Sequence, residues 1–174
     1  MIGEAIRICT AEHPCTPRPV AIPDQLPLET DVATLDGIIR AWYEIVSGPK
    51  GQPRAWGRDR TLYSPEVRFL KASGDAQRKP RATLYDHQGY VNEVDPWLKK
   101  HGFFEQEIHR VTRRFGNTAH VYSTYESREK AEGPVVARGI NSMELFFDGM
   151  RWWIMYAQWQ EETPDLPIPK EYLP

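Results

Sequence analysis

Two stretches of strand-forming residues, each divided by a two-residue turn signal, constrain the fold of this 174-residue chain more than any other feature. Gly116-Asn117 separates FFEQEIHRVTRRF from TAHVYSTYES, and Asp148-Gly149 separates VVARGINSMELFF from MRWWIMYAQWQ. A glycine-first loop fits a type II′ turn and Asp-Gly fits a type I′ turn, so each stretch predicts a β-hairpin. Strands of about ten residues exceed the usual length of about 5–6. Strands this long in a small domain twist and bend, so we expect a curved antiparallel sheet.

The residues before the hairpins have the periodicity of a helix. In residues 31–47 the apolar side chains fall on one stripe, Thr30 can cap the start, and Gly48 followed by Pro49 is a stop signal. The stripe consists of Leu35, Ile38, Ile39, Trp42, Ile45 and Val46. This segment therefore predicts an amphipathic helix that packs on the sheet.

A second helix is expected over residues 86–101, and a short strand over residues 66–71. Within the helix, Asp95 can cap a new start at Pro96, so we expect a kink or two short helices. Helices that come first and hairpins that follow are typical of an α+β domain.

Proline is concentrated at both ends of the chain. It excludes helices and central strands from residues 10–28. The prolines concerned are Pro14, Pro17, Pro19, Pro23 and Pro27, with Pro164, Pro167, Pro169 and Pro174 at the other end. We therefore predict a proline-rich N-terminal arm (1–28), a single folded domain (29–162) and a proline-rich C-terminal tail (163–174).

The composition excludes several classes of partner. The chain carries 22 basic and 24 acidic residues, for a formal charge of −2. A nucleic-acid binder needs a surplus of positive charge, so no nucleic-acid partner is predicted. No apolar run approaches the roughly 18 residues that span a bilayer, so no membrane partner is predicted. The N-terminus lacks a secretory pattern, and we expect a cytoplasmic protein.

Cys9 and Cys15 are the only cysteines, so no disulfide framework is predicted and two reduced thiols are expected. Together with His13 they supply three potential metal ligands, whereas a structural zinc site needs about four. No metal is predicted. No glycine-rich phosphate loop is present either, so no nucleotide or other cofactor is predicted.

Several short runs in the second half of the chain resemble bacterial members of the nuclear transport factor 2-like superfamily, in particular its polyketide-cyclase-like branch. These runs are Gly102-Phe103-Phe104-Glu105, His120-Val121-Tyr122-Ser123-Thr124-Tyr125-Glu126, Arg138-Gly139-Ile140-Asn141-Ser142 and Asp148-Gly149-x-Arg151-Trp152-Trp153-Ile154. The resemblance covers about residues 30–161. It implies a cone-shaped α+β fold in which helices pack in the concavity of a bent sheet. The superfamily includes isomerases, cyclases, dehydratases, dioxygenase subunits and non-catalytic association domains, so the resemblance does not select an activity.

The faces of the sheet follow from the register of the hairpins. If Asp148-Gly149 forms the loop, Phe147 pairs with Met150, and both faces of this hairpin carry apolar groups. One face would meet the helices. The other presents a large patch of four residues: Phe146, Trp153, Met155 and Trp159. Such a patch is rarely left in water, so a homodimer through this face is predicted, with cover by the N-terminal arm as the alternative.

The inner face is predicted to form a ligand pocket. If the hairpins join so that Val121 lies beside Met143, the apolar side chains stay together. This choice predicts five ligand-binding residues: Arg110, Tyr125, Asn141, Tyr156 and Trp152. Phenol and amide groups can polarise a carbonyl or enolate oxygen, and Arg110 can hold a carboxylate. A β-bulge would shift the assignment by one residue and exchange the two faces.

A rival set, Glu107, His109 and His120, is predicted on the opposite face, with His120 near the other end of the hairpin. We interpret these as surface or interface groups. The sequence thus favours a pocket for a small hydrophobic carbonyl compound, with lyase, isomerase or cyclase activity. The inner set contains no Asp, Glu or His to act as a base, which counts against catalysis. The alternative is a non-catalytic dimeric association or ligand-sequestering domain. A carboxylate or histidine in an open cavity would favour the enzyme.

Overall fold

The computed structural model describes residues 5–75 and 77–174. Helices and strands follow one another in the order β1 (Ile6–Cys9), α1 (Glu29–Val32), α2 (Leu35–Val46), α3 (Trp56–Arg60), β2 (Tyr63–Gly74), β3 (Pro80–Tyr85), α4 (His87–Lys100), β4 (Phe104–Phe115), β5 (Thr118–Arg128), β6 (Ala137–Phe147) and β7 (Trp152–Glu161). A 3-10 turn, Lys170–Tyr172, lies near the C-terminus.

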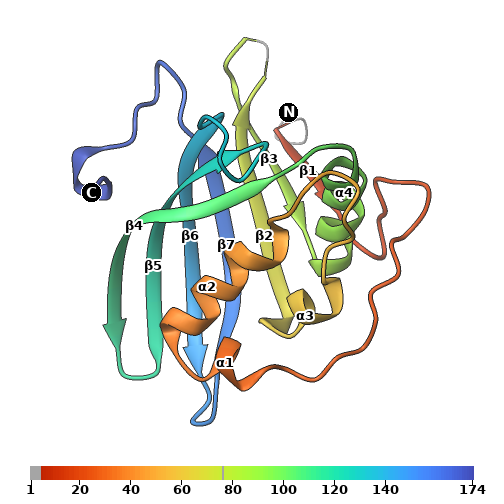
Figure 1. Cartoon of the computed structure of the whole chain (residues 1–174), viewed down its shortest axis with the longest axis vertical. Coiled ribbons are helices and arrows are strands. Elements are labelled where there is room, and N and C mark those ends of the chain that lie inside the picture. Colours follow the sequence, from red (N-terminus) through yellow and green to blue (C-terminus); the bar gives the residue numbers. More distant parts are fainter. Residues whose placement is uncertain (1–4, 76) are drawn as a thin grey trace.

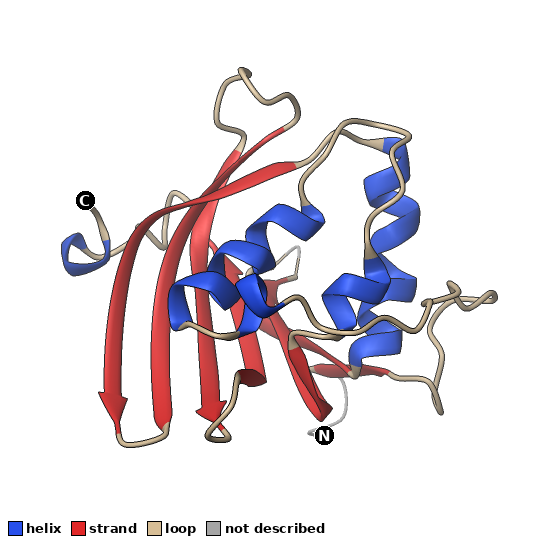
Figure 2. Cartoon of the chain, turned by 60° about the horizontal axis from the view of Figure 1, so that its bottom comes forward, coloured by secondary structure: helices blue, strands red, loops and turns tan. Residues whose placement is uncertain are grey.

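The strands form one bent sheet in the order β1-β3-β2-β7-β6-β5-β4, and the helices gather on one side of it (Figures 1 and 2). The two long hairpins are antiparallel, as predicted. The sheet as a whole is mixed, because β1 pairs parallel with β3 and β2 pairs parallel with β7. The expected α+β cone is confirmed. No helix among the described residues is both long and apolar enough to cross a bilayer.

The first predicted helix is divided in two. Thr34 has extended backbone, and its Oγ1 accepts a hydrogen bond of 2.9 Å from the amide of Gly37. Thr34 therefore caps α2, and the residues before it form the separate turn α1. The apolar stripe of α2 faces the sheet, where Ile38 and Ile39 are completely buried. Burial of each such side chain is worth about 1.5–3 kcal/mol.

The second predicted helix is continuous. Asp86 caps α4 by accepting a hydrogen bond of 2.7 Å from the amide of Gly89. Of the two expectations at Pro96, the division into two short helices is wrong, because Pro96 lies inside α4. The carboxylate of Asp95 does not cap a new helix. It accepts a hydrogen bond of 2.8 Å from the indole of Trp56 instead, which ties α4 to α3.

Residues 10–28 form neither helix nor strand, as their prolines predicted, but β1 in the same arm is the edge strand of the sheet. The C-terminal tail lies against the outer face. The hydroxyl of Thr124 donates to the carbonyl oxygen of Tyr172 over 2.6 Å, and Ile168 is buried. The tail, not the N-terminal arm, thus covers part of the outer face. The division into arm, cone and tail remains a prediction.

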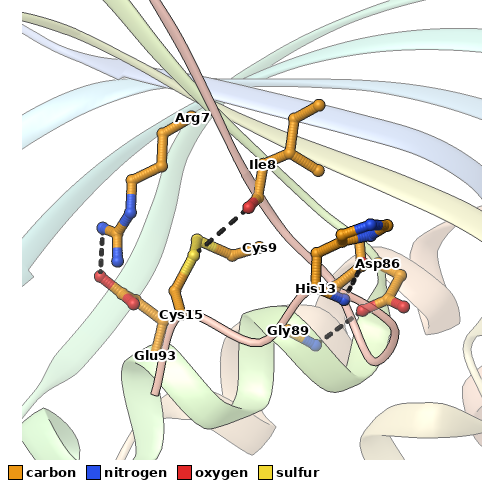
Figure 3. Close-up of a disulfide and its surroundings, with 9 residues drawn as sticks. Arg7, Ile8, Cys9, His13, Cys15, Asp86, Gly89 and Glu93 are labelled. Carbon is orange, nitrogen blue, oxygen red and sulfur yellow. Dashed lines mark hydrogen bonds and ion pairs between the residues drawn. A yellow bond between two sulfur atoms is a disulfide. The ribbon is translucent and has the colours of Figure 1, made fainter.

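A disulfide joins Cys9 and Cys15, so the expectation of two reduced thiols was wrong (Figure 3). No local pattern predicts that these two residues, six positions apart, should meet. In the structure the intervening turn is held by the amide of Ala11, which donates to the carboxylate of Asp86 over 2.8 Å. The amide of His13 also donates to the hydroxyl of Thr10 over 3.0 Å. These contacts bring the two Cα atoms to 5.2 Å, which is within disulfide range.

The first hairpin turns where predicted, and the second does not. Phe115 pairs with Thr118 around Gly116, whose φ of +56° suits a type II′ turn. In the second hairpin Phe147 pairs with Trp152 rather than with Met150. The carboxylate of Asp148 accepts the amides of the two residues at positions 150 and 151, which moves the tip to Gly149-Met150. Near the turn, each residue of β6 thus pairs with a residue of β7 two positions later than predicted. Because side chains alternate with a period of two, this shift leaves them on their predicted faces.

Two β-bulges exchange the faces farther from the tips. One lies in β4 between Glu107 and His109, and the other in β7 between Ile154 and Tyr156. Beyond the first bulge, Glu105 and Glu107 turn inward, opposite the inner residues of β5. Beyond the second, Trp159 turns inward and Tyr156 outward. The predicted inner and outer sets are therefore wrong for these residues. The predicted join of Val121 to Met143 is confirmed.

Candidate functional site

A cavity of about 330 Å³ lies between α2, α4 and the inner face of the sheet. Its walls are mostly aromatic, and a few polar groups converge on it. The aromatic lining residues are Trp42, Tyr85, Tyr90, Trp97, Phe103, Tyr125 and Trp159, and the polar ones are Lys71, Glu93, Glu105, Ser127, Asn141 and Glu161. An apolar pocket with few polar groups is the usual form of a small-molecule site.

Glu105 is one of three acidic residues that line this cavity, together with Glu93 and Glu161. The end of α2 fixes its backbone, because the amide of Glu105 donates to the hydroxyl of Ser47 over 3.0 Å. Within the described part of the chain, the carboxyl group has no hydrogen-bond or ion-pair partner. Burial, and secondarily the nearby carboxylate of Glu161, raise the pKa of Glu105 to about 8. Glu105 can therefore exchange a proton near neutral pH.

Tyr125 lines the same cavity and is only 4% exposed. Its phenol rests on Gly139, where an added Cβ would lie 2.5 Å from the phenol oxygen. Only glycine leaves room for this ring. Burial, then the charges of Glu105 and Glu161, raise the pKa of Tyr125 well above its usual value, so the phenol stays protonated. It can donate a hydrogen bond to a bound oxygen atom.

Asn141 connects the cavity to a chain of polar groups behind α2. Its Nδ2 donates to the phenol oxygen of Tyr43 over 3.1 Å, and that phenol lies 2.6 Å from the hydroxyl of Ser123. Ser123 in turn donates to the carboxylate of Glu107 over 2.5 Å. The guanidinium group of Arg110 holds the same carboxylate with two hydrogen bonds of 2.8 and 2.6 Å. The chain crosses the cone from the cavity to its other side.

The structure brings only part of the predicted ligand set together. Tyr125 and Asn141 line the cavity. Arg110 is neutralised behind α2 by Glu107 and by Asp36, 2.5 Å away. Trp152 is buried away from the cavity lining and lies under the guanidinium group of Arg114, and Tyr156 is on the outer face. Arg110, Trp152 and Tyr156 therefore do not contribute to this cavity.

The rival set does not form a cluster. Glu107 turns inward at the bulge, whereas His109 stands opposite Thr124, whose hydroxyl binds the tail on the outer face. His120 lies 2.9 Å from the hydroxyl of Ser142, also on the outer face. These residues keep their interpretation as surface and structural groups, except that Glu107 joins the inner polar chain.

Sequence reasoning missed the residues that give the cavity its chemistry. Glu105 and Trp159 were assigned to the outer face because strict alternation was assumed along β4 and β7. Tyr85 was missed because the sequence analysis predicts no strand over the residues of β3. The available signal for Glu105 was its place on a long predicted strand, two residues from a second carboxylate, Glu107. It could not be used without knowing where the bulge lies.

No known family profile and no curated protein matches the chain. Solved structures do match. A protein of unknown function with a cystatin-like fold from Nostoc punctiforme aligns with a TM-score of 0.55 at 6% identity, over 76% of this chain and 91% of that one. The β subunit of a proposed aromatic-ring-hydroxylating dioxygenase from Novosphingobium aromaticivorans gives 0.53 at 14% identity, over 74% and 87%.

A proposed ketosteroid isomerase from Parabacteroides distasonis aligns with a TM-score of 0.50 at 12% identity, over 78% of this chain and 98% of that one. At these identities the likeness concerns the fold alone. The chain therefore shares the fold of these solved structures, one of which is described as cystatin-like.

Proposed function

We propose that the protein binds a small hydrophobic carbonyl compound in the aromatic cavity and moves a proton on the carbon next to the carbonyl group. This is the chemistry of an isomerase, a lyase or a cyclase. The observation that carries the proposal is Glu105, a carboxyl group without a cationic partner in the described chain, whose pKa is about 8. The same fold in a proposed ketosteroid isomerase is compatible with it.

Each residue has a defined role in this reaction. The carboxylate of Glu105 takes a proton from the carbon, and the electron pair of the broken C–H bond moves onto the carbonyl oxygen. Tyr125 donates a hydrogen bond to the resulting enolate oxygen, since its phenol stays protonated. The protonated Glu105 then returns the proton to the same or a neighbouring carbon. A base with a pKa near the working pH is effective in both directions.

Proton abstraction can be tested without knowing the natural substrate. In deuterated water, NMR would follow exchange of the protons beside the carbonyl of small aromatic ketones such as acetophenone. We expect wild-type protein to accelerate exchange and Glu105→Gln to abolish the acceleration. His109→Ala, on the outer face, is the matched control and retains it. Equal acceleration by wild type and Glu105→Gln would contradict the proposal.

The second candidate is a non-catalytic dimeric association or ligand-sequestering domain. It is favoured by the outer face, where Phe146 and Met155 are each 40% exposed beside Trp153. Trp159 does not belong to this patch, because its side chain points inward and its ring centroid lies 5.9 Å from that of Tyr90. We propose that two copies pair through the remaining three residues. Light scattering at micromolar concentration should give a dimer, and Met155→Glu a monomer.

A cytoplasmic location remains part of the proposal. Thiols are kept reduced in that compartment, so the disulfide between Cys9 and Cys15 counts against this location. Alkylation of intact cells followed by mass measurement would decide. A fully oxidised pair would contradict the proposed location.

A further inference from the structure

The polar chain behind the cavity has a fixed direction. Glu107 is a carboxylate held by Arg110, so it can only accept, and Ser123 must donate to it. The hydroxyl of Ser123 has one proton, so it must accept from the phenol of Tyr43. Tyr43 has then used its own proton, and its oxygen must accept from Asn141. The group of Asn141 that faces Tyr43 is therefore the NH₂ group.

This direction determines which atom of Asn141 remains for a ligand. The amide oxygen Oδ1 has no hydrogen-bond partner within the described chain, although the residue is only 3% exposed and lines the cavity. Oδ1 is open to the cavity, so water can bind it while the cavity is empty. A ligand that displaces this water must supply a donor, because otherwise Oδ1 is left unpaired at a cost. The orientation is set by residues that do not line the cavity: Tyr43, Ser123 and Glu107.

We propose that Asn141 presents its oxygen to the cavity and selects ligands that carry a hydroxyl or N–H group in addition to their carbonyl group. The inference rests on the proposed function, because Glu105 and Tyr125 are taken to bind the carbonyl end. Asn141 is then a specificity-determining residue, and Tyr43, Ser123 and Glu107 are positioning residues that act through it. A hydroxylated carbonyl compound is the ligand class that can engage Glu105, Tyr125 and Asn141 together.

The discrimination expected from such a site is substantial. A site built to hydrogen-bond a polar group rejects an analogue that lacks it, since its own buried polar atom is then left unpaired. We expect hydroxylated ligands to bind at least about tenfold more tightly than analogues whose hydroxyl group is methylated or absent.

The test uses calorimetric titration of the full chain with the three hydroxyacetophenone isomers, their methoxy counterparts and acetophenone. At least one hydroxy isomer should bind about tenfold more tightly than its methoxy counterpart. If every pair binds within twofold, the inference is overturned and the proposed function stands. If no compound in the set binds, the proposed function is overturned and the inference with it.

Two variants test the positioning chain. Glu107→Gln can donate to Ser123, so the chain can reverse and Asn141 can present its NH₂ group instead. Ser123→Ala removes the connection altogether. In both variants the preference for the hydroxyl group should fall below about twofold, while acetophenone binds as before. Glu107→Gln leaves Ser123 and Arg110 with a hydrogen-bond partner. It therefore still tests the positioning role if Ser123→Ala does not fold. Full preference in the Gln variant would overturn the positioning role.

Discussion

Glu105 and Glu107 stand two residues apart on β4 and face the same side of the sheet, yet their surroundings are opposite. Glu107 receives two hydrogen bonds from Arg110 and one from Ser123. Glu105 faces an aromatic cavity, has no cation beside it in the described chain, and has a pKa of about 8. The C-terminal end of α2 lies beside both residues, because the hydroxyl of Ser47 accepts from the amide of Glu105 and Tyr43 contacts Ser123, the partner of Glu107.

The comparison shows how one strand supplies both a structural and a reactive carboxyl group. A carboxylate that is paired with a guanidinium group contributes to folding and keeps its charge. One that is enclosed by aromatic rings and lies near a second carboxylate holds its proton until higher pH. The unpaired group is therefore the candidate for chemistry, and the paired group is the candidate for stability and orientation.

The largest expected difference between the two carboxyl groups concerns proton exchange. Glu105→Gln should lower the rate of ketone proton exchange by about 100-fold or more, since it removes the base. Glu107→Gln should lower it by less than about tenfold, because that residue acts only through Asn141. NMR rates in deuterated water measure both variants. Similar losses in the two variants would show that the two settings are not functionally distinct.

The pH dependence sharpens the same contrast. Exchange requires ionised Glu105, so its rate should rise about tenfold per pH unit below pH 8 and level off above it. The free energy of unfolding should change with pH in the opposite direction. Because the folded pKa lies above the usual value of 4.5, the wild type loses stability as pH rises from about 4.5 towards 8.

Glu105→Gln is the control for this pH effect. Its thermal midpoint should exceed that of wild type at pH 8 by more than at pH 5, because it carries no buried carboxyl group to ionise. Calorimetric melting of both proteins at the two pH values provides the measurement. A constant difference between them would mean that Glu105 titrates normally in the folded protein.

The hydrogen-bond donor of the cavity should have a smaller effect than its base. Tyr125→Phe keeps the ring over Gly139 and removes only the hydroxyl group, so exchange should slow by about tenfold. The fold should be retained, since the hydroxyl has no partner in the described chain to lose. An unchanged rate would exclude Tyr125 from the reaction.

The smallest expected effect concerns stability at the paired site. Arg110→Ala leaves Glu107 without its cation, and should cost about 1–2 kcal/mol in urea unfolding, because both side chains are about 20% exposed. Arg7→Ala is the control. It removes one pair, with Glu93, in which the two side chains are 53% and 32% exposed, and should cost less than about 1 kcal/mol. Equal costs would show that the Glu107 pair is no more protected than a surface pair.

Several elements of the fold could be predicted because their signals are local. The turn at Gly116-Asn117, the stripe of α2 and the exclusion of regular structure from residues 10–28 each depend on neighbouring residues. Tyr125 and Asn141 could be placed on the inner face because β5 and β6 pair without a bulge. The edge strand β1 and strand β3 could not be predicted, since each is short and depends on its partner for its hydrogen bonds.

Local patterns are enough to predict the fold class, because period-2 strands around tight turns and a 3.6-residue stripe before them are compatible with few architectures. The residues of the site are brought together only by long-range packing. One extra residue at each of two bulges turns Glu105 and Trp159 inward and Tyr156 outward, and a bulge has no signal along a single strand. The direction of the Asn141 amide is likewise set by Tyr43, Ser123 and Glu107, which are distant in sequence and meet only in the folded cone.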